Sequence, residues 1–479
     1  MNNENNLMIG LEIHCQLNTK SKLFCSCSSD FRNDKPNTHI CPICFGLPGT
    51  LPVLNKKAII YGIKIGLALN CEIQKECIFC RKNYYYPDLV KAFQITMGDN
   101  PIGINGYLNV ELGDNNTKKI SISRIHLEED PGRLVHVSNE NGNYTLVDYN
   151  RSGIPLIEIV TNPDIQSPKE ARLFLNKLRL MLEYLDVVET ENEGSLRVDA
   201  NISFSGYNRV EIKNISSYKG VEKALLYEMK RQEDMIKKGE YIKRETRHYH
   251  EDSGITTEGR SKETAMDYRY FPEPDLPIYT ISSFMNEISL PELPDQRCKR
   301  VINEYHISKY YASVLVSNLK LINFYEKVAC INAKLTATLL VDILIGELNF
   351  RNLNISNILK YDTWIIEWIN LLNNKIITEK SSVSILRFFL DTIISSNTIE
   401  TPLKIMEKLN LKKESIELFK DKIIEIINNN KKAILDHQSG KKGALNYVIG
   451  KIMKETKGKI DPSEINKIVL EIINNRKLK

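Results

Sequence analysis

The sequence IGLEIHCQL, residues 9–17, decides how the first part of this chain folds, because its apolar and polar residues alternate strictly. Alternation with a period of two is typical of a half-buried β-strand, so Glu12, His14 and Gln16 are predicted to share one face. The other face is apolar and carries Ile9, Leu11, Ile13, Cys15 and Leu17. Since side chains two residues apart lie about 7 Å apart along a strand, Glu12 and His14 are candidate ligands of one metal ion or one phosphate group.

Length and composition indicate a globular chain of several domains. The chain has 479 residues, of which 42% are hydrophobic and 26% charged, and a typical domain size of about 150 residues predicts about three domains. No apolar run approaches the roughly 20 residues of a membrane span, and the N-terminus has no signal-peptide pattern. We therefore expect a protein of the bacterial cytoplasm or of an organelle interior, and not a secreted one.

The basic charge of the chain is concentrated in its C-terminal tail. The net charge is +5, yet residues 431–479 contain twelve Lys/Arg and only five Asp/Glu. Such an excess is typical of nucleic-acid binding. The alternative is a soluble, lysine-rich helical face.

Four of the ten cysteines have the spacing of a metal site. Thirteen residues separate Cys25-x-Cys27 from Cys41-x-x-Cys44, and the second pair lies in a proline-containing knuckle. Four thiolates would fill the tetrahedral shell of Zn²⁺, so such a site is structural. Alternatively the cysteines are small buried residues or the remains of a lost site, or His39 replaces one ligand. For the Cys77-x-x-Cys80 pair, which has no second pair at suitable spacing, we expect core cysteines.

Residues 1 to about 290 contain most of the glycine, proline and alternating strands, whereas the rest has helical periodicity. Within the first part, Ser167-Pro168-Lys169-Glu170 has the N-cap, the N1 proline and the capping-box glutamate that begin a helix. The prolines at 272, 274, 277, 291 and 294 mark the end of this part, since proline disfavours helix at the residue before it.

Three further strands of the first part are predicted to carry charged residues on one open face. In residues 121–129, Glu128 shares a face with Arg124 and His126. Residues 195–204 and 209–213 form a predicted hairpin, whose polar face carries Arg197, Asp199, Glu211 and Lys213. Each strand alone also fits a solvated sheet surface. Together, Glu12, His14, Glu128, Asp199 and Glu211 are ligands suited to Mg²⁺. The basic residues Arg124, Arg197 and Lys213 are suited to phosphate.

Several stretches of this sequence closely resemble one enzyme family, the B subunit of the glutamyl/aspartyl-tRNA amidotransferase. The resemblance covers essentially the whole chain, and the stretches that carry it are GLEIH (10–14), RKNYYYPDL (81–89), HLEED (126–130), SLRVDAN (195–201), EIKN (211–214), RHY (247–249) and DYRYFPEPDLP (267–277). The sequence departs from the family at two places. Members commonly have Lys-Gly-Tyr-Gln where this chain has Lys91-Ala92-Phe93-Gln94, and a more polar run where it has Thr96-Met97-Gly98.

The resemblance implies an α+β fold with three parts. These are a catalytic cradle domain with an antiparallel sheet (1–292), a helical domain (293–405) and a helical tail that contacts tRNA (406–479). It also implies a carbon–nitrogen ligase that uses ATP and Mg²⁺ to phosphorylate the side-chain carboxylate of Glu on tRNA(Gln), or of Asp on tRNA(Asn). Ammonia from the amidase, the A subunit, then displaces the phosphate. A small clamp, the C subunit, is the third member of the complex.

The same resemblance implies roles for individual residues. Glu12, His14, Glu128 and Glu211 would bind Mg²⁺ with Asp199 nearby, Arg197 and Lys213 would bind the phosphates of ATP, and Lys82, Lys91 and Glu128 would line an ammonia passage. For the last three, an ordinary salt bridge is the alternative. Two other functions stay open, which are a non-catalytic tRNA-binding scaffold and a metal-dependent hydrolase.

Overall fold

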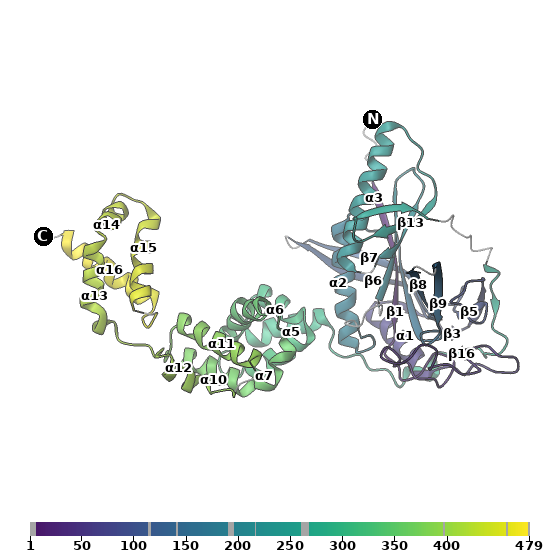
Figure 1. Ribbon diagram of the computed structural model, residues 1–479, viewed down its shortest axis with the longest axis horizontal. Coiled ribbons are helices and arrows are strands. Elements are labelled where there is room, and N and C mark those ends of the chain that lie inside the picture. The colour runs from purple at the N-terminus through teal and green to yellow at the C-terminus, as the bar shows by residue number, and fades with distance from the viewer. Residues whose placement is uncertain are drawn as a thin grey trace. The chain divides into compact units, whose positions relative to one another are not determined.

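The computed structural model describes residues 6–113, 116–139, 142–189, 196–215, 217–259, 268–395, 398–456 and 458–477. Ser195 and Asp267, each the first residue of a stretch that resembles the family, lie outside this set. The chain divides into two compact units, Met1–Pro294 and Asp295–Lys479. The first unit, which we call the sheet domain, contains the large sheet, and the second, the helical unit, contains helices (Figure 1).

One sheet of 12 strands organises the described part of the sheet domain. Its longest path has the order β14-β13-β12-β11-β1-β10-β7-β5-β4-β15, with β6 beside β7 and β2 beside β6, and all of its pairs except β12–β13 are antiparallel. The strands are β1 (Leu7–Gln16), β2 (Glu72–Ile73), β4 (Cys80–Asn83), β5 (Phe93–Thr96), β6 (Gly103–Gly113), β7 (Asn116–Glu129), β10 (Pro155–Thr161), β11 (Leu196–Phe204), β12 (Val210–Ile215), β13 (Glu245–His250), β14 (Ile255–Glu258) and β15 (Phe271–Pro272).

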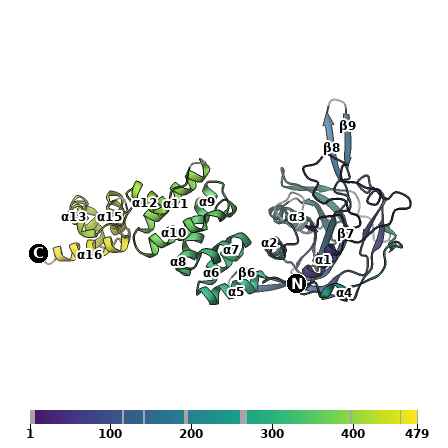
Figure 2. The same cartoon turned by 90° about the horizontal axis from the view of Figure 1, so that it is seen from below.

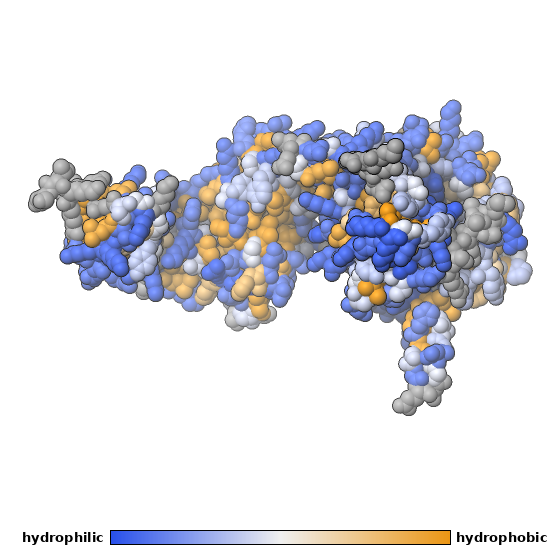
Figure 3. All heavy atoms as spheres, turned by 90° about the horizontal axis from the view of Figure 1, so that it is seen from above, coloured by the Kyte–Doolittle hydropathy of each residue, from blue (hydrophilic) through white to orange (hydrophobic). Residues whose placement is uncertain are grey.

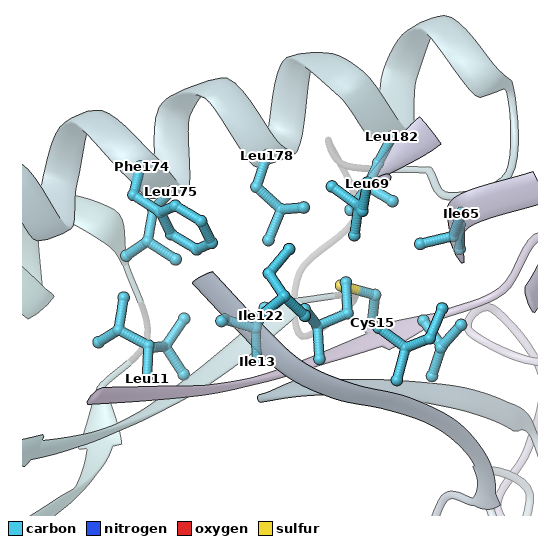
Figure 4. Packing of buried hydrophobic residues seen from close by; sticks show 14 of the residues in the cluster. Leu11, Ile13, Cys15, Ile65, Leu69, Ile122, Phe174, Leu175, Leu178 and Leu182 are labelled. Atoms are coloured by element: carbon cyan, nitrogen blue, oxygen red, sulfur yellow. The ribbon is translucent and has the colours of Figure 1, made fainter. Parts of the chain in front are cut away.

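The alternation of residues 9–17 is confirmed in β1, a central strand between β10 and β11. Its apolar face lies under α2 (Pro168–Leu185), whose Phe174, Leu175, Leu178 and Leu182 point toward Leu11, Ile13 and Cys15 (Figure 4). Because Leu178 is fully buried, its replacement by Ala is expected to cost about 2–5 kcal/mol. Burial of this face turns Glu12 and His14 toward the opposite face of the sheet.

The start of α2 has the predicted N-cap and first-turn proline, but the predicted capping box does not form. The Ser167 side chain accepts a hydrogen bond from the Glu170 backbone N–H, and Pro168 occupies the first turn. The Glu170 carboxylate accepts from the backbone N–H of Gln166, so it caps one residue earlier than a standard capping box would. Two other helices, α1 (Lys56–Ala68) and α3 (Tyr218–Lys238), pack beside α2, on the face of the sheet opposite to Glu12 and His14.

Two small two-stranded sheets and a short helix complete the described part of the sheet domain. The first small sheet pairs β3 (Glu76–Cys77) with β16 (Tyr279–Thr280), and α4 (Ser282–Met285) follows it. The second is a hairpin of β8 (Arg133–Asn139) and β9 (Gly142–Asp148). This hairpin projects from the sheet domain as a narrow arm, visible in Figure 2 and, with its mixed hydropathy, in Figure 3.

The described part of the helical unit consists of helices joined by turns and loops. They are α5 (Pro294–Tyr305), α6 (Lys309–Val316), α7 (Leu319–Val328), α8 (Ala333–Thr338), η2 (Leu339–Leu344), α9 (Ile345–Phe350), η3 (Ile355–Asn357), η4 (Leu359–Tyr361), α10 (Asp362–Asn373), α11 (Glu379–Ile394), α12 (Pro402–Lys408), η5 (Ile416–Phe419), α13 (Lys420–Asn429), α14 (Lys431–Gln438), α15 (Lys442–Glu455) and α16 (Pro462–Lys477).

The α+β fold class expected from the sequence is confirmed. The proposed three-part division stays a prediction, although its first boundary, at 292, is close to the division between the two compact units. Helices α13, α15 and α16 share a hydrophobic cluster of their own, which agrees with a separate tail. No described helix is long and apolar enough to span a membrane.

Candidate functional site

The open face of the large sheet carries a cleft with a volume of about 1000 Å³. Strand pairing aligns its polar residues in rows: Glu12 of β1 is opposite Asp199 of β11, and His14 is opposite Glu158 of β10. Glu158 is in turn opposite His126 of β7. Since paired residues of antiparallel strands have neighbouring side chains, these strands deliver their acids and imidazoles to the same place.

The first group of candidate ligands, the histidine cluster, consists of His14, Glu128 and Glu158, whose ligand atoms all lie within 4.8 Å of one another. His14 Nε2 is 3.5 Å from Glu158 Oε2 and 3.6 Å from Glu128 Oε1. Burial alone would lower the pKa of His14, but the hydrogen bond to Glu158 and the nearby carboxylates outweigh burial and raise this pKa to about 9. In the absence of a metal ion, the protonated imidazole thus balances the negative charge of the two carboxylates. A bound cation would balance the same charge in its place.

His126 supports the histidine cluster from β7. Its Nε2 lies 3.1 Å from Glu158 Oε2 and 3.9 Å from Glu128 Oε2, and its side chain is almost fully buried. Burial would raise the pKa of Glu158, yet the charge and hydrogen bond of His126, followed by those of His14, hold this pKa well below its ordinary value. Glu158 is therefore an anion in the buried wall of the cleft.

The second group, the carboxylate cluster, consists of Glu12, Asp199 and Glu211, again with ligand atoms within 4.8 Å of one another. Lys213 Nζ lies 2.9 Å from Asp199 Oδ2 and 3.8 Å from Glu211 Oε1. Asn201 donates to Glu12 Oε1 at 3.0 Å. Each carboxylate is thus held in place by a neighbour while retaining lone pairs for a ligand.

The residues proposed from the sequence for one Mg²⁺ site are therefore divided between two clusters. His14 and Glu128 are in the histidine cluster, whereas Glu12 and Glu211 are in the carboxylate cluster with Asp199. Sequence reasoning missed Glu158, although a signal was present: it is the only charged residue in the apolar stretch IPLIEIV, residues 154–160. A lone carboxylate inside an apolar strand needs a partner, and here the partners are two histidines.

The two cations proposed for phosphate are both engaged by carboxylates. Arg197 donates to Asp130 Oδ1 at 2.6 Å, and the fully buried Asp130 also accepts from Gln16. Arg197 is not among the residues that line the cleft, whereas Lys213 does line it but pairs with Asp199. The phosphate role of both residues stays a prediction.

The three residues proposed for an ammonia passage are not in one place. Lys82 lies in the cleft with Glu128, and its ammonium is 4.7 Å from the ring centre of Tyr268. Lys91 instead binds Glu129, with Nζ–Oε distances of 2.6 and 2.8 Å. Glu128 and Glu129 are consecutive in β7, so their side chains point to opposite faces of the sheet.

The Lys91–Glu129 pair lines a smaller cavity of about 230 Å³ that also touches the cysteine knuckle. Gly46 of the knuckle, at φ +67°, lies so close to Lys91 that a Cβ there would be 2.6 Å from Lys91 Cγ. The knuckle and the Lys91 side chain are therefore in direct contact.

The sulfur atoms of Cys25, Cys27, Cys41 and Cys44 lie within 4.8 Å of one another. A hydrogen bond from Cys25, helped by the Cys41 backbone N–H and the Lys22 ammonium, lowers the pKa of Cys44 to about 4. Four clustered sulfurs with a favoured thiolate are the donor set that structural zinc requires. In contrast, Cys77 and Cys80 are buried and belong to no group of candidate ligands among the described residues.

Comparison with known proteins identifies the family. Residues 7–287 match the family model described as the GatB/GatE catalytic domain, and residues 323–473 match the GatB domain. The chain belongs to the B-subunit family of the aspartyl/glutamyl-tRNA(Asn/Gln) amidotransferases. Similar relatives, each named as the B subunit of this enzyme, come from Methanoregula boonei, at 52% identity over 98% of both chains, Methanospirillum hungatei, at 53% over 98% of both, and Methanosarcina barkeri, at 46% over 98% of both.

Membership of the B-subunit family makes this chain part of an enzyme of the ligase class. The first family match covers nearly all of the sheet domain, including both ligand clusters and the four cysteines. The resemblance noted from the sequence is thereby confirmed, and the stretches that carried it supply Glu12, His14, Glu128, Asp199 and Glu211 to the cleft.

Proposed function

We propose that this chain uses ATP to phosphorylate the side-chain carboxylate of Glu on tRNA(Gln), of Asp on tRNA(Asn), or of both, and then transfers ammonia to it. The products are Gln-tRNA(Gln) or Asn-tRNA(Asn), ADP and inorganic phosphate. The observation that carries the proposal is the cleft in this member of the B-subunit family, where two groups of metal-type ligands lie beside basic residues.

The reaction needs activation because a carboxylate is a poor electrophile with a poor leaving group. Transfer of the γ-phosphoryl group to the carboxylate oxygen gives an acyl phosphate and releases ADP. Ammonia then attacks the carbonyl carbon, the C–O bond to phosphate breaks, and the nitrogen loses a proton to form the amide. Phosphoryl transfer mainly requires positioned reactants and balanced charge.

The ligand clusters fit Mg²⁺, because oxygen ligands and one imidazole are the donors that this cation accepts. His14, Glu128 and Glu158 would hold one ion, and Glu12, Asp199 and Glu211 would hold a second. Mg²⁺ in these positions would balance charge on the transferring phosphate. Within the chain, Lys213 orients Asp199 and His126 orients Glu158, as residues behind metal ligands commonly do.

Ammonia would reach the cleft from the amidase, which is the A subunit, and the small C subunit would be the third member of the complex. Lys82 and Glu128 would line the end of the passage at the cleft. The separate cavity lined by Lys91 and Glu129 would be an earlier part of such a route. We also propose that the cysteine site holds structural Zn²⁺ and that the basic tail binds tRNA.

The experiment that tests this function measures ADP release by the complex of this chain with the amidase and the small third protein. The reaction contains ATP, Mg²⁺ and labelled Glu-tRNA(Gln), and no ammonia donor. We expect tRNA-dependent ADP release in the wild type and its loss in Glu128→Gln, with tRNA binding retained. If the wild type binds the tRNA but releases no ADP even with ammonia, the chain is a tRNA-binding scaffold and the proposed catalysis is wrong.

A further inference from the structure

Two exposed arginines, Arg209 and Arg244, lie side by side at the rim of the cleft. Arg209 directly precedes β12 and Arg244 directly precedes β13. These strands are parallel and pair in the register Val210 with Glu245. The two arginines therefore occupy neighbouring positions at the same ends of adjacent strands, which lie about 4.8 Å apart.

Both arginines point to the face that carries the carboxylate cluster. Arg209 is two residues from Glu211, and Arg244 is two residues from Thr246, whose hydroxyl donates to Glu211 Oε2 at 3.0 Å. Side chains two residues apart along an extended segment share a face and are about 7 Å apart. The arginine pair thus lies one step along the strands from a proposed metal site.

Within the described residues, neither arginine makes a hydrogen bond or an ion pair, in contrast to Arg124 and Lys213 of the cleft and to Arg197 of β11. Arg197 is bound to Asp130, Lys213 to Asp199, and Arg124 is 3.9 Å from Glu158. Guanidinium groups remain charged at any pH of interest, so two of them side by side repel each other and the repulsion is not relieved by loss of a proton. A bound anion between them would relieve it.

We propose that Arg209 and Arg244 bind the phosphate chain of the nucleoside triphosphate, beside the proposed metal sites. This inference rests on the proposed function and extends it, because it assigns phosphate binding to two residues that the sequence did not suggest. Arginine suits the role, since its planar fork donates two parallel hydrogen bonds to one phosphate. The phosphodiester groups of tRNA offer the same chemistry. The nucleotide is favoured because the arginines lie only two residues along their strands from the carboxylate cluster.

The test uses the full chain assembled with the other proteins of its complex. Calorimetry measures the affinity for a non-hydrolysable ATP analogue with Mg²⁺, and filter binding measures the affinity for uncharged tRNA. The variants are Arg209→Gln, Arg244→Gln, the double Gln variant and the double Lys variant. The control is Arg172→Gln, an exposed arginine of α2 that pairs with Glu222 on the helix-covered side of the sheet.

We expect each Gln variant to weaken nucleotide binding about tenfold, since a hydrogen bond to a charged group contributes about that much. The double Lys variant should lose less nucleotide affinity than the double Gln variant, because lysine retains the positive charge but not the planar pair of donors. The affinity for tRNA should be unchanged in every variant. The control Arg172→Gln should bind the nucleotide as tightly as the wild type. In turnover, the KM for ATP should rise more than kcat falls, which a purely structural defect would not produce.

Two results would overturn the inference while leaving the proposed function intact. One is a nucleotide affinity of the double Gln variant equal to that of the wild type, which would mean that the two arginines are solvated residues without a ligand. The other is unchanged nucleotide affinity with weakened tRNA binding, which would assign them to the tRNA backbone. If the wild-type complex itself binds no nucleotide in the presence of Mg²⁺, the proposed function fails, and this inference fails with it.

Discussion

Glu158 and Glu129 show how much depends on single carboxylates in this fold. Both are buried, and each is held by side chains of neighbouring strands or loops, Glu158 by His126 and His14 and Glu129 by Lys91. A buried carboxylate without a partner would cost several kcal/mol. Because Glu158 and its partner His14 are both candidate metal ligands, Glu158 belongs to the chemistry of the cleft.

Replacing Glu158 by Gln should therefore impair the enzyme through its metal. The change keeps the size of the side chain but removes a charge from the histidine cluster, so we expect ADP release to fall about 100-fold at low Mg²⁺ and to recover partly as Mg²⁺ is raised. Glu222→Gln, on the helix side, is the matched control. Equal activity of Glu158→Gln and wild type at every Mg²⁺ concentration would exclude Glu158 as a ligand.

Cys44 offers a second test at the residue scale. Cys44→Ser removes the sulfur whose pKa is lowest in the cluster, so the purified chain should lose about one zinc ion. Its melting temperature should fall by about 4 °C or more, since binding to the folded state stabilises it. Metal analysis and calorimetry measure both effects. Cys330→Ser, an exposed thiol, should change neither, and zinc retained by Cys44→Ser would contradict the proposed site.

Among the elements, α5 and α7 illustrate how the helical unit is held together. Arg297 and Arg300 of α5 both bind Glu326 of α7. Burial raises the pKa of Glu326, but the hydrogen bonds and charges of the two arginines outweigh burial and lower it below the ordinary value. Glu326 therefore stabilises the folded state above its unfolded pKa of about 4.3, and this contribution disappears as pH falls through its folded pKa.

Glu326→Gln should accordingly destabilise the helical unit by about 1 kcal/mol at pH 7, and the difference from wild type should shrink below about pH 4. Urea unfolding followed by tryptophan fluorescence reports on this unit, because the two tryptophans of the chain, Trp364 and Trp368, are both buried in α10. The control Glu304→Gln removes an exposed carboxylate from the same network and should cost much less. A difference that grows toward acid pH would contradict the assignment.

For the whole molecule, a charged cleft in the sheet domain and a basic tail in the helical unit predict two independent binding functions. Lys431, Lys432 and Lys451 are exposed in α14 and α15. Changing all three to Gln should weaken tRNA binding and reduce its salt dependence, because fewer counterions are released. Binding of the ATP analogue should stay the same.

The matched control for the tail changes Lys219, Lys237 and Lys238 of α3 to Gln, which removes the same charge from the sheet domain. Filter binding at several salt concentrations compares the two triple variants. If both weaken tRNA binding equally, the effect is one of net charge, and the tail has no special role.

The sequence by itself determined the features that depend on near neighbours. The alternation of β1, the capped start of α2 and the spacing of the four cysteines are local features. The structure shows the strand and the cap, and it brings the four sulfur atoms together. The division between Glu128 and Glu129 also follows from alternation alone, because consecutive residues of a strand face opposite ways.

Only the tertiary structure decided which of these residues meet. Pairing of β1 with β10 and β11 brings Glu158 to His14 and Asp199 to Glu12, and so divides the acids between two clusters. The parallel pairing of β12 with β13 places Arg209 beside Arg244. Strand partners and their register are set by burial of whole faces against α1, α2 and α3, a property that involves residues far apart in the chain and that no local pattern contains.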